Sequence, residues 1–277
     1  MTDEKNWPLH YAGFLTRLVA LTGSALILSL SAGGEAATNQ FSFNDYLLVA
    51  VRVHLLSAKD SPAIQTTLTE RDINRILGKM NGVWSQAGLH FYLESVVREE
   101  AVHQETYAQG GRQSERIGLL ALRPAGSKAT NLFHIYYVKE MSVNGIYFPE
   151  AIFVKDTASL RKVEGGLDEP LPRVTSHELG HALGLGHRQN ITNLMASGTT
   201  GAWLNEEEIK QAREAARKLS WIESAAELME KANDLFGANK MREAARVYSR
   251  LATLPLKVEQ VELAGKRLAE TTRADPN

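Results

Sequence analysis

The string HELGHALGLGH, at residues 177–187, constrains this chain more than any other part of its sequence. On a helix of 3.6 residues per turn, His177 and His181 lie one turn apart on the same face, so two imidazoles can bind one metal ion. Glu178 projects beside them, within reach of a water on that metal. The order H-E-x-x-H therefore predicts a zinc site with a carboxylate base.

A third ligand requires the helix to end soon after His181. If the helix continued, the six residues to His187 would add about 600° of rotation and about 9 Å of rise, which would carry His187 away from the metal. Gly184 lets the chain leave the helix, because glycine adopts the left-handed conformation that ends helices at little cost. We therefore expect His177, His181 and His187 to bind Zn²⁺ and to leave one position open, as in catalytic zinc sites.

HELGHALGLGH resembles the signature of the metzincin clan of zinc endopeptidases, which also place a methionine-containing turn beneath the metal. Met195 follows the third histidine at a suitable interval and resembles that methionine, packing under the histidines without binding zinc. The resemblance extends over about residues 45–220. Within it, residues 81–91 and 201–209 resemble the first helix with the second strand, and the start of the last helix, of matrixin-like bacterial members.

Two departures from the clan leave its subfamily open. Arg188 follows the third histidine, where the matrixin, adamalysin and astacin groups carry Ser, Asp or Glu, and the tyrosine of astacin-like members is missing after Met195. The resemblance implies a metzincin-like α/β (α+β) catalytic domain with a mixed, mostly parallel sheet and an active-site helix. It also implies hydrolysis of peptide bonds in a protein or peptide substrate by a zinc-activated water, with Glu178 as the general base.

Two other functions stay open on the sequence. A zinc amidase that acts on a non-protein peptide, such as cell-wall material, would use the same residues. A partner-binding scaffold would instead work through the C-terminal helices. Glu178 favours an enzyme, because a scaffold has no need of that carboxylate.

Hydrophobic periodicity predicts the elements around the motif. Thr69 and Asp72 have the spacing of a helix cap. By the resemblance, residues 145–148 form the sheet edge above the cleft, where an extended peptide can pair through its backbone. In chain order, the predicted elements are strand 46–56, helix 69–87, strand 89–97, a polar segment 99–128 broken at Gly110-Gly111, strands 131–138, 145–148 and 151–154, the metal-binding helix 173–183 and a closing helix 204–219.

The C-terminal residues read as helical, with mixed charges typical of a solvated surface. Residues 228–255 resemble a single tetratricopeptide hairpin with its turn at 237–240. Stacked repeats need about three units to be stable alone. We therefore expect the hairpin to pack on the catalytic domain, with a protein partner at these helices as the alternative. The residues of its predicted apolar face are Leu228, Leu235, Phe236, Val247 and Leu251.

The N-terminal segment predicts the localisation of the protein. Residues 18–30 are uncharged and mostly apolar, shorter than the about 20 residues of a membrane span but typical of a secretory signal peptide. We interpret residues 1–36 as a signal peptide or N-terminal anchor, residues 37–220 as the catalytic domain and residues 221–277 as the helical tail. The protein is then exported, secreted or periplasmic, or is held in a membrane by residues 14–30 if the segment stays uncleaved.

Composition excludes some partners and ligands. Lys plus Arg number 31 against 32 Asp plus Glu, so no basic excess indicates a nucleic-acid partner. The chain has no cysteine, which excludes thiolate ligands for zinc. The remaining histidines with no ligand spacing, expected to be ordinary core or surface residues, include His54, His90, His103 and His134.

Overall fold

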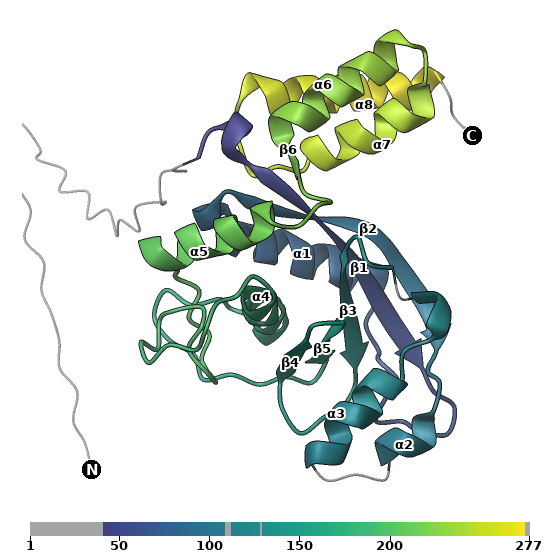
Figure 1. The fold of residues 1–277 in the computed structure, drawn as a ribbon, viewed down its shortest axis with the longest axis vertical. Coiled ribbons are helices and arrows are strands. Elements are labelled where there is room, and N and C mark those ends of the chain that lie inside the picture. Colours follow the sequence, from purple (N-terminus) through teal and green to yellow (C-terminus); the bar gives the residue numbers. More distant parts are fainter. Residues whose placement is uncertain (1–40, 109–111, 128, 275–277) are drawn as a thin grey trace, which may run out of the picture. The chain divides into compact units, whose positions relative to one another are not determined.

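The sheet at the centre of the fold is mixed and mostly parallel, as predicted (Figure 1). The computed structural model describes residues 41–108, 112–127 and 129–274, and it orders the strands β2-β1-β3-β5-β4. Only β4 runs antiparallel along this path, paired to β5 at the sheet edge. The strand bounds are β1 Leu47–Ser57, β2 Leu89–Glu100, β3 Phe133–Val138, β4 Gly145–Phe148 and β5 Ala151–Lys155.

Two predictions concern residues that the structure does not describe. The signal segment at 1–36, with its anchor at 14–30, lies outside the described residues, and so does the Gly110-Gly111 break. Among the residues that are described, no helix has both the length and the apolar character that crossing a membrane requires.

Strand β1 is buried on both faces, which explains its nearly continuous apolar sequence. On one face its side chains enter the main core, under the helices α1 (Glu70–Trp84) and α4 (Pro170–Ala182). On the other face Tyr46, just before the strand, and Leu48 join a second cluster, and Leu56 joins a third. The β1 side chains in the main core are Leu47, Val49, Val51, Val53 and Leu55.

Helix α1 confirms the predicted cap. The Thr69 hydroxyl accepts a hydrogen bond from the Asp72 N–H at 3.3 Å, and the Asp72 carboxylate accepts one from the Thr69 N–H at 2.9 Å. The α-helix ends earlier than predicted, at Trp84, and is followed by a 3₁₀ turn (η2, Ser85–Ala87). Gly88 then has a positive φ of 57° and connects this turn to β2. The periodic apolar residues of α1 face the main core as expected.

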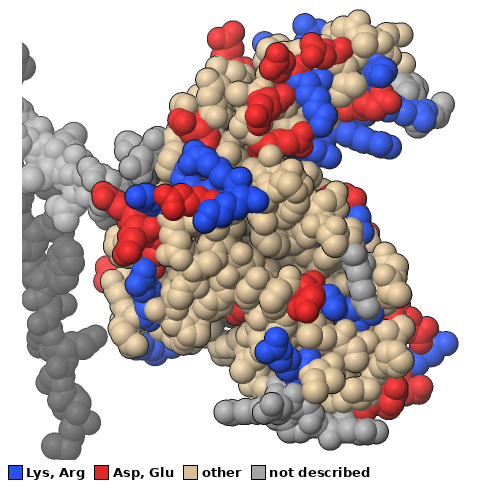
Figure 2. Space-filling view, viewed as in Figure 1, with Lys and Arg blue, Asp and Glu red and all other residues tan. Residues whose placement is uncertain are grey.

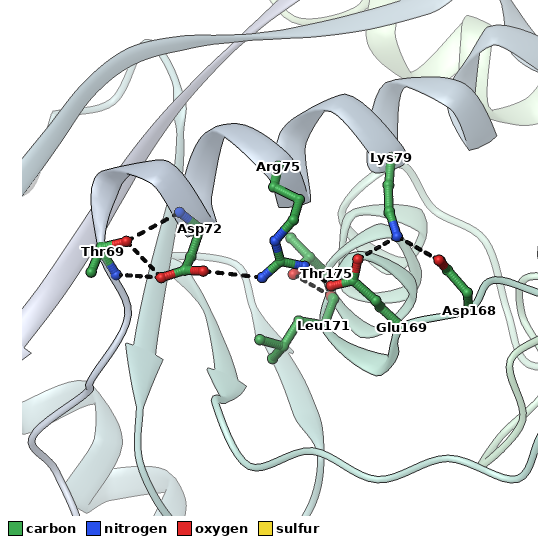
Figure 3. A network of polar contacts seen from close by, with 8 residues as sticks. All are labelled: Thr69, Asp72, Arg75, Lys79, Asp168, Glu169, Leu171 and Thr175. Carbon is green, nitrogen blue, oxygen red and sulfur yellow. Dashed lines mark hydrogen bonds and ion pairs between the residues drawn. The ribbon is translucent and has the colours of Figure 1, made fainter.

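The outer face of α1 contacts the start of α4 (Figure 3). Lys79 donates to both Asp168 carboxylate oxygens at 2.7 Å and also pairs with Glu169, which in turn pairs with Arg75. Exposed ion pairs of this kind contribute little stability each. The two carboxylates at the amino end of α4 have the sign that a helix N-terminus favours, so the network orients the helix that carries the metal-binding string.

The described residues between 99 and 127 contain helices that the sequence analysis did not predict. They contain α2 (Gln104–Ala108), α3 (Arg112–Ala121) and a 3₁₀ turn, η3 (Ala125–Ser127). Leu119 and Leu122, three residues apart, are buried in the third cluster below β3 and β5. The polar composition concealed these helices, because only one narrow apolar face was needed to hold them to the sheet.

The C-terminal residues form helices, with one difference from the all-helical prediction. Between α5 (Glu206–Arg217) and α6 (Ala225–Gly237), the two-residue strand β6 (Glu223–Ser224) pairs antiparallel with the start of β1. The predicted turn at 237–240 is present, with Asn239 at a φ of 59°, and leads into α7 (Met241–Leu251) and α8 (Glu259–Ala274). Lysine, arginine and acidic side chains mix over these helices in Figure 2, as expected of a solvated surface.

The apolar face of the helical tail covers the start of β1. Ala225 N–H donates to the Tyr46 carbonyl at 2.9 Å, and Arg250 stacks over the ring of Tyr92 on β2. Residues 37–277 accordingly form one compact unit. The second cluster joins Phe43, Tyr46 and Leu48 to tail residues that include Leu228, Ala232, Ala244, Val247, Tyr248 and Leu251.

Candidate metal centre

Helix α4 carries the first two histidines and ends where the sequence predicts. It begins at Pro170, three residues earlier than expected, because proline is well tolerated in the first turn of a helix. At its end Gly184 has a φ of 82°. The Leu185 N–H donates to the Gly180 carbonyl and the Gly184 N–H to that of His181, both at 2.9 Å, which is a Schellman termination.

This termination turns the chain back so that His187 meets the other two histidines. The Nε2 atoms are 3.1 Å apart for His177 and His181, 3.1 Å for His181 and His187, and 3.2 Å for His177 and His187. A tetrahedral zinc with Zn–N bonds of about 2.0–2.1 Å separates its ligand atoms by about 3.3 Å. The three histidines therefore form a group that can hold a metal ion.

The other ring nitrogens determine which atoms face the centre of this group. His177 Nδ1 lies 2.9 Å from the Leu194 carbonyl, and His181 Nδ1 lies 2.8 Å from the Leu185 carbonyl. Because a carbonyl only accepts, each Nδ1 carries the proton and each Nε2 keeps its lone pair. Burial lowers the pKa of His177 to about 3 and also lowers that of His181, so both are neutral at pH 7. Converging neutral lone pairs fit a bound cation.

Met195 lies beneath the histidines, packed against α4. Its side chain is fully buried, and a Cβ added at Gly180 would lie only 2.5 Å from its sulfur. Glycine at position 180 therefore provides the space that the methionine occupies.

Replacement of Met195 by leucine is expected to preserve the metal site. The volume is nearly conserved, so unfolding free energy should fall by less than about 1.5 kcal/mol and metal content should not change. Thermal unfolding and metal analysis measure both, with M80L, a swap of another buried methionine remote from the site, as the matched control. A folded M195L protein without metal would contradict a packing role.

The loop around Met195 is held by a buried carboxylate that the sequence did not reveal. Glu208 on α5 is fully buried, accepts from Arg188 Nε at 2.7 Å and accepts from Asn193 Nδ2 at 2.7 Å. The Asn193 side chain in turn accepts from the Met195 N–H at 2.6 Å. Arg188, noted above only as a departure from the clan, therefore fastens the loop to α5.

Glu178 lies against the edge strand β4. A Cβ added at Gly145 would lie 2.6 Å from Glu178 Oε1, so glycine is required for the strand to approach this closely. The carboxylate accepts a hydrogen bond from the Tyr147 N–H. Burial raises the pKa of Glu178 to about 8, against the opposing influences of the Arg173 charge and the Tyr147 hydrogen bond. The importance of Gly145 could not be recognised from the sequence, where it is one of 21 glycines.

A cavity of about 810 Å³ brings these groups together. Residues 142–147, including β4, form one wall, α4 supplies the floor, and Ser197 and Gly198 lie opposite. Residues 142–147 and 197–198, far apart in the sequence, thus both line the cavity. The prediction of β4 as a sheet edge is confirmed.

The other histidines of the described residues do not add a second metal site. His54 and His134, distant in sequence, lie side by side with His54 Nε2 2.8 Å from His134 Nδ1, while Glu99 accepts from His54 Nδ1 at 2.6 Å. These groups form a chain rather than converge on a point. Within the described residues, only the three histidines of the string meet as potential ligands.

Comparisons with known proteins found only distant structural likenesses. No protein-family model matches the sequence, and no curated protein matches it. The structure is similar to a chain from a chaperone–substrate complex, with 13% identity, a TM-score of 0.38, and coverage of 64% of this chain and 35% of that one. It is also similar to an archaemetzincin from Methanopyrus kandleri, with 12% identity, a TM-score of 0.35, and coverage of 62% of this chain and 93% of that one. A third similar structure is metalloproteinase-II from Bacteroides fragilis, with 13% identity, a TM-score of 0.36, and coverage of 61% of this chain and 53% of that one. This chain thus spans about a third of the chain from the chaperone–substrate complex and about half of the metalloproteinase-II chain. The functional assignment rests on the site itself.

Proposed function

We propose that this chain is a zinc-dependent metalloendopeptidase that hydrolyses peptide bonds in proteins or peptides. The observation that carries the proposal is the convergence of three histidine nitrogens beside a buried glutamate in an open cavity. His177, His181 and His187 would hold the metal through Nε2. When bound, zinc activates water and polarises a carbonyl group.

Glu178 would transfer the proton. A carboxylate next to the first histidine can accept a proton from the attacking water and then donate it to the leaving amine nitrogen. A pKa raised towards neutrality by burial suits a group that must both accept and donate. Transfer of this proton lets the amine leave as a neutral group.

Strand β4 would hold the substrate. Its outer edge has no strand beside it among the described residues, and an extended peptide can pair with such an edge through backbone hydrogen bonds. Gly145 brings the strand against the Glu178 carboxylate. A peptide paired with β4 would therefore pass close to the proposed base.

The test is cleavage of a proteome-derived protein and peptide mixture by the full-length protein. Cleavage should require about one zinc per chain, cease with a chelator and return with added zinc. H187A should lose most of its zinc and all detectable cleavage, because two ligands remain. H103A, which removes an exposed histidine, is the matched control.

Three results would contradict the proposal. Full zinc occupancy in folded H187A would reject the three-ligand site. Cleavage that survives zinc removal would reject the mechanism. Hydrolysis of cell-wall peptides with no cleavage of proteins would favour the amidase alternative.

A further inference from the structure

Arg173 is a buried cation that borders the cavity. It lies on α4 one turn before His177, and only 2% of its surface is exposed. Its Nε donates to the Gly201 carbonyl at 3.1 Å, and its Nη2 donates to the Ala196 carbonyl. The guanidinium thus spans from α4 to the loop that forms the opposite side of the cavity.

Arg173 makes no direct ion pair among the described residues, although the Glu178 carboxylate is near enough to oppose the lowering of the Arg173 pKa by burial. Among the described residues, no carboxylate oxygen lies within 4.0 Å of its nitrogens and no group accepts from Nη1. An unpaired buried cation is costly, because carbonyl groups replace only part of the hydration that the charge loses. The Arg173 Nη1 group can therefore take a further acceptor from the cavity that this residue borders.

Arg213 shows what a purely structural arginine looks like in the same molecule. It is also buried, at 6% exposure, and it lies on α5 away from the cavity. Both of its terminal nitrogens are used, since Nη1 donates to the Ala87 carbonyl at 2.8 Å and Nη2 to the Asp45 carbonyl at 2.9 Å. In Arg173 one terminal nitrogen remains available.

The polar surroundings indicate which anion fits. Arg173 is the one lysine or arginine that borders the cavity in the described structure, and the walls beside it carry Leu160 and Val174. A side chain with an apolar stem and a carboxylate tip would pack on these walls and reach Nη1. We propose that Arg173 determines specificity by binding an aspartate or glutamate side chain of the substrate beside the scissile bond. This inference rests on the proposed peptidase function and names its substrate class.

The test compares substrates that differ only in charge. A peptide that the protein cleaves is synthesised with Glu or Gln at each of the two positions on either side of the cleaved bond. At one position the wild-type protein should prefer Glu over Gln in kcat/KM by about 10- to 100-fold, the range that a hydrogen bond to a charged group supplies. In R173Q this ratio should fall to about 1.

The matched control is R213Q, which removes the other buried arginine. It should lower stability but keep the Glu-to-Gln ratio, because Arg213 is remote from the cavity. If Arg173 only clamps the loop, R173Q will slow cleavage of both peptides equally and the ratio will not change, which overturns the proposal. If R173Q does not fold, the wild-type ratio decides, since values near 1 at all positions reject an acidic preference.

A binding measurement separates this inference from the peptidase proposal. Zinc-loaded E178Q is expected to retain peptides without cutting them, so its affinity for the Glu and Gln peptides can be compared by titration. Equal affinities overturn the role of Arg173 even if the wild-type protein is a peptidase. If no peptide is ever cleaved, the proposed function fails. The anion site is still supported if E178Q binds a Glu peptide from the same mixture more tightly than its Gln counterpart and R173Q/E178Q does not.

Discussion

Replacement of Glu178 by glutamine is expected to lower peptide hydrolysis by about 100-fold or more while leaving the fold and the metal site intact. Glutamine has nearly the same shape, so it can lie beside Gly145 and accept from the Tyr147 N–H as glutamate does. What it lacks is a basic oxygen. Steady-state kinetics on one peptide, with metal content and thermal unfolding of the same sample, measure the effect.

The control is E207Q, which removes an exposed carboxylate on α5. It should behave as the wild type in all three measurements. Near-normal turnover by folded, zinc-loaded E178Q would mean that another group takes the proton from water. Loss of zinc in E178Q would instead mean that Glu178 supports the ligands.

Removal of the helical tail is expected to destabilise the rest of the protein. A chain shortened to residues 37–220 loses β6 and uncovers Phe43, Tyr46 and Leu48, which are buried with the tail helices. Each such side chain contributes roughly 1.5–3 kcal/mol when buried. The shortened chain should therefore aggregate or melt at least about 5 °C lower than the full-length protein.

Point substitutions test the same contact without shortening the chain. Leu228 is fully buried in the second cluster, whereas Leu263 on α8 is 38% exposed. L228A should cost about 2–5 kcal/mol, and L263A much less. A soluble 37–220 chain that cleaves peptides at the wild-type rate would show that the tail is an independent module and would favour the partner-binding alternative.

The sequence by itself determined those features that depend on neighbouring residues. The histidine string predicts a helix that must end at Gly184, and the Schellman hydrogen bonds occur there. Thr69 and Asp72 cap α1 because a helix cap involves residues only three apart. Strand positions also followed from alternation, whereas the mostly parallel sheet followed from the resemblance. The differences from the prediction were at element ends, in the two-residue strand β6, and in α2 and α3, whose apolar face is narrow.

Only the tertiary structure decided how distant segments meet at the site. Gly145 lies against Glu178, Glu208 holds the loop beneath the histidines, and Arg173 reaches from α4 to the carbonyls of Ala196 and Gly201. None of these relations has a sequence signature, because each joins side chains brought together by the packing of separate elements. The attachment of the tail to β1 is of the same kind: periodicity identified its apolar face, and the available surface of the sheet decided where that face is buried.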